Sequence, residues 1–159
     1  TFQMQRVFFR KQYKLLVMER IKTFLFKEPA LPFAYSIILL VVRIIFGILF
    51  LSHGVAKWTA FNDATENFPD PLNLGSTLTF WLAIFAEVAC SFGFILGALF
   101  RLSLIPMIFT MFIAVFVIHA GDPLAVKELA LMYLTIFVLT FFSGPGRISI
   151  DGLLRKMIS

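Results

Sequence analysis

Four stretches of mostly apolar residues, each close to the length of a membrane span, dominate this sequence. A helix needs ~20 apolar residues to cross the hydrocarbon core of a bilayer. Only helices and closed barrels span membranes, because backbone groups in lipid must form hydrogen bonds within the protein. The four stretches are too long and too uniformly apolar for barrel strands. We therefore predict an all-α integral membrane four-helix bundle with spans over residues 35–58, 77–100, 102–119 and 124–142.

The composition agrees with this prediction. Of the 159 residues, 60% are hydrophobic and 14% are charged, whereas soluble domains carry about 25% charged residues. The length fits one compact bundle over residues 34–159, preceded by a segment over residues 1–33. The stretch GDPLAVKE predicts a turn before the fourth span. The second and third spans must form a tight antiparallel hairpin around Arg101.

Basic residues concentrate on one side of the predicted bundle, the side that cytoplasmic loops occupy in most membrane proteins. We therefore predict a multi-pass protein of the bacterial inner (plasma) membrane with both termini in the cytoplasm; an organellar membrane is the alternative. The net charge of +5 indicates orientation and no nucleic-acid partner, because no binding-fold pattern surrounds the basic residues. The opposite side carries Lys57, Lys127, Asp63, Glu66, Asp70 and Asp122.

Residues 1–28 alternate basic and apolar side chains at roughly helical spacing. This pattern predicts a basic amphipathic helix at the membrane surface, with a docking arm for a partner subunit as the alternative. Pro29 and Pro32 should end it before the first span. We interpret the first span as retained, because its apolar run is too long for a signal peptide and no cleavage site follows. Met18 is an alternative start, which would make residues 1–17 an extension.

Motifs for metals and common cofactors are absent from the sequence. The single cysteine, Cys90, excludes an internal disulfide and a CxxC dithiol. We interpret it as a small packing residue beside Gly93 and Gly97, whose GxxxG spacing lets helices approach closely. The sequence has no zinc-type ligand spacing or Gly-rich phosphate loop, and no evident haem or flavin motif. We predict no metal site.

Ionisable residues interrupt the first two apolar runs. Arg43, His53 and Lys57 share one stripe of the first predicted helix, and Glu87 lies in the second. Such residues cost ~2.5–3.5 kcal/mol each at the centre of a span and therefore need partners. Arg43 and Glu87 have similar estimated depths, and the planar fork of arginine matches a carboxylate. We predict that these two residues form an ion pair.

Four polar residues fall at the outer end of the bundle: His53, Lys57, His119 and Glu128. They are expected to converge around its outer mouth, with Arg43 and Glu87 deeper. The alternative is that each extends separately to the interface. Imidazole and carboxyl groups exchange protons, histidine near neutral pH. Candidate catalytic residues are therefore His53, Glu87, His119 and Glu128.

Five motifs, in chain order, carry a family resemblance: RIIFGILFLSHGVAKW, FAEVACSFGFILGALFR, FVIHAGDP, KELALMYL and GPGRISID. Over residues 34–155 the sequence resembles the DoxX family of small four-helix membrane proteins. The family takes its name from the small membrane subunit of an archaeal thiosulfate:quinone oxidoreductase, so the resemblance implies a membrane redox subunit that passes electrons toward a quinone. The quinone-binding candidates that it implies are Arg43, His53, Lys57, Glu87 and His119.

The last of these motifs also has a structural interpretation. Gly144 and Gly146 can end the fourth helix. Ser149 can cap a short surface helix, with Asp151 in its first turn.

Two functions from different classes follow. The first is a quinone-linked redox subunit, for which a quinone is the cofactor and a partner protein supplies electrons. The second is a non-catalytic accessory or assembly subunit of a larger membrane complex. Whether the chain is an enzyme is left open by these residues. Membrane lipid, other membrane or redox subunits, or further copies of the chain are the expected partners. A small transporter ranks last, because the two helical hairpins show no inverted repeat.

Overall fold

The computed structural model describes residues 2–26, 32–60 and 68–158, and within these residues the chain is all-α. Four of the helices described are long and apolar enough to cross a membrane. They are Phe33–Thr59, Ser76–Leu96, Phe100–Ile118 and Leu124–Ser143. The four-helix membrane architecture predicted from the sequence is therefore confirmed.

The second and third spans are each divided by a π-helical turn. The second consists of α4 (Ser76–Ile84), η1 (Phe85–Ala89) and α5 (Cys90–Leu96). The third consists of α6 (Phe100–Ile113) and η2 (Ala114–Ile118). A π-turn widens the helix locally, and such turns occur frequently at functional sites.

The predicted tight hairpin joins the second and third spans, but the second span ends earlier than expected. Gly97 has a positive φ of 65° and Leu99 one of 45°, so the chain reverses at residues 97–99. Glycine adopts this conformation without a steric penalty, which explains why α5 stops at Leu96. Arg101, expected in the loop, lies instead in the first turn of α6, where its Nε donates to the Phe141 carbonyl at 3.2 Å.

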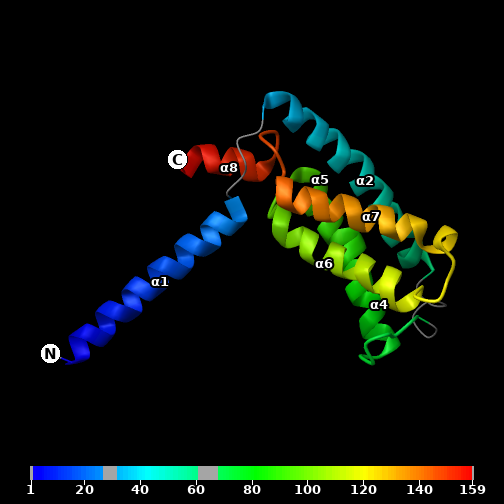
Figure 1. The fold of residues 1–159 in the computed structure, drawn as a ribbon, viewed down its shortest axis with the longest axis horizontal. Coiled ribbons are helices and arrows are strands. Elements are labelled where there is room, and N and C mark those ends of the chain that lie inside the picture. The colour runs from blue at the N-terminus through cyan, green and yellow to red at the C-terminus, as the bar shows by residue number, and fades with distance from the viewer. Residues whose placement is uncertain (1, 27–31, 61–67, 159) are drawn as a thin grey trace.

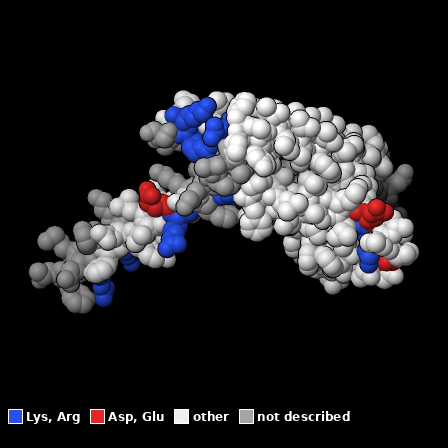
Figure 2. Space-filling model, turned by 45° about the horizontal axis from the view of Figure 1, so that its top comes forward, with Lys and Arg blue, Asp and Glu red and all other residues white. Residues whose placement is uncertain are grey.

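The remaining spans are α2 (Phe33–Thr59) and α7 (Leu124–Ser143), and Figure 1 shows the arrangement of the four spans. Their buried core is rich in Phe, with Tyr133, Leu and Met side chains beside the rings. α2 lies along α5, and α6 lies along α7. Figure 2 shows a broad surface without Lys, Arg, Asp or Glu, with charged side chains gathered toward the ends of the molecule. The outer faces of the helices expose many large apolar side chains. Together these features place the bundle in contact with lipid.

The basic N-terminal segment forms a separate helix, α1 (Phe2–Phe26), which extends away from the bundle (Figure 1). Its apolar side chains Phe9, Tyr13 and Leu16 are exposed. Pro29 lies outside the described residues, as do Asp63 and Glu66.

The motif GPGRISID (residues 144–151), which we call the closing motif, turns the chain after α7. It leads into α8 (Ile150–Ile158). Gly144 and Gly146 have φ values of 79° and 80°, which glycine alone adopts readily. The Ser149 hydroxyl accepts the Gly152 amide at 3.0 Å, so the predicted helix cap is confirmed. The carboxylate of Asp151 serves a different helix, because it accepts the amides of Leu99 and Phe100 at 3.0 and 2.9 Å. The end of the chain thereby caps the start of α6.

Candidate functional site

The centre of the candidate site is an ion pair between α2 and η1. Lys57 Nζ lies 2.8 and 2.6 Å from the two carboxylate oxygens of Glu87. The Glu87 side chain is 3% exposed and that of Lys57 is 32% exposed. The helices approach closely here because Gly54 has no side chain: a Cβ at that position would lie 2.8 Å from Glu87 Cβ. Glu87 therefore has the countercharge that a carboxylate in a span requires.

The predicted pair between Arg43 and Glu87 is wrong. Arg43 is 1% exposed, and its guanidinium donates to four backbone carbonyls instead. Nε donates to Phe94 at 3.1 Å and Nη2 to Ile95 at 2.7 Å, while Nη1 donates to Pro145 and Ile148 at 2.7 and 2.8 Å. Arg43 thus ties the end of α5 to the closing motif.

The physical reason for this correction is the register of two antiparallel helices. Arg43 is level with Gly97, where a Cβ would lie 2.9 Å from Nη2, whereas Gly54 is level with Glu87. Ten residues separate Glu87 from Gly97 in the sequence, about 15 Å along a helix. The side chain of Arg43 cannot span that distance, and Lys57 is the cation at the correct level.

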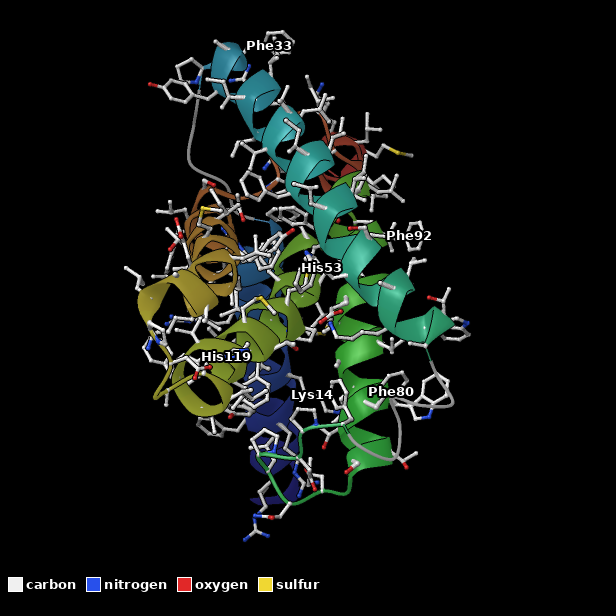
Figure 3. All side chains as sticks on the ribbon, turned by 90° about the vertical axis from the view of Figure 1, so that its right-hand side faces the viewer. Lys14, Phe33, His53, Phe80, Phe92 and His119 are labelled. Carbon is white, nitrogen blue, oxygen red and sulfur yellow. The ribbon has the colours of Figure 1, made fainter. Side chains whose placement is uncertain are left out.

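Both histidines, His53 on α2 and His119 just after η2, line the same cavity, and both are labelled in Figure 3. His53 is exposed on α2, and its ring lies edge-to-face against Tyr133 of α7 at 5.8 Å between centroids. His119 follows η2, and its Nδ1 lies 2.7 Å from a carboxylate oxygen of Asp122. An imidazole whose Nδ1 donates to a carboxylate has its other nitrogen available for a ligand or a proton.

Two cavities meet at the ion pair. The first, of about 260 Å³, opens between α2 and α7 and includes His53 and Tyr133 in its lining. The second, of about 340 Å³, lies between α4 and α6 beneath the loop that contains Phe68 and Leu72. The residues common to both linings are Lys57, Glu87, Met111 and His119. The polar groups Lys57, Glu87 and His119 therefore lie where the two cavities meet, and we call this place the junction.

Four of the six predicted site residues are brought together here: His53, Lys57, Glu87 and His119. Glu128 is exposed on α7 and belongs to neither lining. Arg43 also lines neither cavity; it lies fourteen residues from Lys57 on α2, about 21 Å away along the helix.

Sequence reasoning missed Tyr133 and Asp122 as members of the site. Tyr133 is 4% exposed and packs against both Phe50 and His53. A phenol inside the fourth apolar run, within the motif KELALMYL, was the available signal. Asp122 was assigned only to the outer loop, although its spacing of three residues from His119 permits the contact seen.

The loop above the second cavity is fastened by Asp70. Its carboxylate accepts the Thr79 hydroxyl at 2.8 Å and the amides of Leu74 and Gly75 at 3.0 and 2.7 Å. The Thr79 hydrogen bond is the main cause that holds the pKa of Asp70 below its usual range, and the two amides act in the same direction. The loop is therefore tied to the first turns of α4.

Comparison with known proteins agrees with the resemblance seen in the sequence. The model of the DoxX family matches residues 38–120, more than half of the chain. A protein of Haemophilus influenzae, described only as uncharacterized, is 28% identical over 127 residues, which cover 75% of this chain and 84% of that protein. No solved structure matches. This chain belongs to the DoxX family.

Proposed function

We propose that this chain is the quinone-binding membrane subunit of a redox complex, and that the quinone head lies at the junction of the two cavities. The observation that carries the proposal is the ammonium group of Lys57. It has three N–H donors, and the Glu87 carboxylate accepts two hydrogen bonds from it. Within the described part of the chain, the third donor has no protein partner, and Lys57 lines both cavities.

The residues present fit a single-ring quinone. Small-molecule sites are mostly apolar and have a few placed polar groups. The cavity of about 340 Å³ is at the low end of the range for such sites, and the cavity of about 260 Å³ lies just below it. They suit a single ring better than a dinucleotide. Phe50 and Tyr133 supply flat apolar surface on one side of Lys57.

Each polar group has a role that follows from its contacts. Lys57 can donate to a carbonyl oxygen, and Glu87 balances its charge. His119, oriented by Asp122, can hold or release a proton beside the same junction. A quinone, when bound, supplies a two-electron, two-proton redox couple. The electrons come from a partner redox protein, which makes this chain a subunit rather than a complete enzyme.

We place the chain in a bacterial plasma membrane with both termini in the cytoplasm. The basic residues of α1, α8 and the start of α6 support this orientation, because cytoplasmic ends carry the excess of Lys and Arg. The junction then lies toward the outer surface.

A non-catalytic accessory subunit is the second candidate, and α1 favours it. A basic helix that extends from the bundle with exposed apolar side chains is suited to a membrane surface or a larger complex. This candidate predicts that Glu87→Gln impairs assembly, seen as altered migration on native gels, without any loss of bound quinone.

Extraction of purified protein for bound quinone, read by mass spectrometry, tests the proposal. We expect near-stoichiometric quinone in the wild type and in Glu128→Gln, a matched control outside both cavities. We expect loss of quinone in Glu87→Gln and in Lys57→Met, with thermal unfolding used to show that each variant is folded. Equal quinone in all four proteins, or quinone in none of them after purification in polymer-bounded membrane discs without detergent, would rule the proposal out.

A further inference from the structure

The second cavity is built differently from the first. It lies beneath the 68–72 loop, and its walls are almost entirely apolar. Its charged lining residues are Lys57 and Glu87, whose ion pair we call its floor, and His119 also belongs to its lining. Its main apolar wall residues are Phe68, Leu72, Leu82, Ala83, Phe109 and Ile113.

The roof of this cavity is anchored by specific bonds. Asp70 accepts two amides of its own loop and the hydroxyl of Thr79, itself a lining residue on α4. The rings of Trp58 and Trp81 meet edge-to-face with 5.6 Å between their centroids. Trp58 directly follows the lining residue Lys57, and Trp81 directly precedes the lining residue Leu82. Tryptophan is enriched at membrane–water interfaces. The cavity, which lies between α4 and α6, is therefore near that level of the membrane.

We propose that this cavity holds the isoprenoid chain of the quinone whose head lies at the junction; this inference rests on the proposed function. A molecule with one polar end and an apolar chain matches a cavity with a polar floor and apolar walls. The volume of about 340 Å³ equals about eleven water molecules at ~30 Å³ each, enough for part of one chain. The first cavity, lined in part by His53, then serves the proton-exchanging side of the head.

The charges at the floor select against a phospholipid. Glu87 is 3% exposed and occupies the floor together with Lys57. A phosphate brought to Lys57 would place a second negative charge beside this carboxylate, which is unfavourable in a low-dielectric site. A neutral carbonyl oxygen accepts from Lys57 without that repulsion.

Photo-crosslinking in lipid nanodiscs tests the inference. The probe is a benzoquinone that carries an alkyl chain with a terminal diazirine, and the labelled peptides are mapped by mass spectrometry. We expect saturable labels on the α4 and α6 walls, at Leu82, Phe109 or Ile113, displaced by an unlabelled long-chain quinone. Ala83→Phe fills the cavity and should abolish these labels while binding of a chainless benzoquinone persists; Ala56→Phe, at an exposed position of α2, should leave the labels unchanged.

Each other outcome overturns the inference in a different way. Labels confined to the α2–α7 side, displaced by quinone, would retain the quinone site and place the chain elsewhere. Labels on the same residues from a phospholipid that carries the same diazirine chain, not displaced by quinone, would make a lipid acyl chain the occupant. Absence of saturable labelling together with no binding of the chainless benzoquinone would refute the proposed function itself. If Ala83→Phe does not fold, Ile113→Trp narrows the same cavity from α6 and decides the question.

Discussion

Arg43 should be a stabilising residue rather than a ligand-binding one, and Arg43→Met tests this directly. The guanidinium donates to four carbonyls that belong to α5 and the closing motif. The Phe94 oxygen also accepts the Gly97 amide at 3.3 Å, so it keeps a partner when the side chain is shortened. The carbonyls of Ile95, Pro145 and Ile148 lose the bond to Arg43.

The magnitude follows from these three acceptors. Each buried polar group left without a partner costs about 1–3 kcal/mol. Because the bonds to Ile95 and Ile148 are only partly buried, we take the lower part of this range and expect a total loss of about 3–5 kcal/mol. In a chain of this size, 1 kcal/mol corresponds to about 2–4 °C in Tm. Arg43→Lys should lose less, since one ammonium reaches only some of the four oxygens.

Thermal unfolding of the purified protein in detergent is the assay. Ile44→Met, an exposed neighbour on α2, is the control and should keep the wild-type Tm. The reasoning is refuted if Arg43→Met unfolds at the wild-type temperature. If this variant unfolds at the wild-type temperature and also loses bound quinone, Arg43 acts in the ligand site instead.

Three further predictions concern close packing, helix capping and pH. Gly54→Ala should lower the free energy of unfolding by about 1–3 kcal/mol, because the new Cβ would lie 2.8 Å from Glu87 Cβ. Gly121→Ala is the control, since nothing lies within 4 Å of a Cβ there, and thermal unfolding should show no change in its stability. Asp151→Ala should cost about 1–2 kcal/mol through loss of the cap on α6, and Asp151→Asn less, measured in the same way. Asp70 has a lowered pKa in the folded protein, so its stabilising effect is present above the ordinary aspartate pKa of about 4 and is lost as the pH falls through the lowered value. The Tm difference between wild type and Asp70→Ala should therefore be constant near neutral pH and shrink in acid; a difference that does not change with pH would contradict this.

Much of the fold was predictable because one physical requirement, backbone pairing in lipid, fixes the length and type of each span. The second span shows the limit of that argument. Apolarity continues through Gly97, Ala98 and Leu99 without a break, yet the helix ends at Leu96. Hydropathy does not register backbone conformation, and the positive φ of Gly97 is what ends the helix.

The membership of the candidate site was predictable in part, and its ion pair was not. A polar residue inside an apolar run is conspicuous, so Lys57, Glu87 and His119 could all be found. The cation that faces Glu87 is decided by the register of α2 against the antiparallel second span. Gly47 and Gly54 set this register, because α2 can approach the second span closely only where it has no side chain; a Cβ at Gly47 would clash with Ile95. Helix-wheel angles describe one helix at a time and contain no such information.

A layer of aromatic side chains lies between Arg43 and the Lys57–Glu87 ion pair. Phe50, Phe94 and Phe137 are 0–1% exposed, and their rings meet at 4.9 and 5.4 Å between centroids. The buried hydroxyls of Ser91 and Thr140 donate to carbonyls of their own helices and offer no relay. Within the described core this aromatic layer separates Arg43 from the Lys57–Glu87 ion pair, an arrangement poorly suited to an ion that crosses the membrane. If a quinone binds at the junction as proposed, its protons should therefore exchange with the side of the membrane that carries the 68–75 loop and His119.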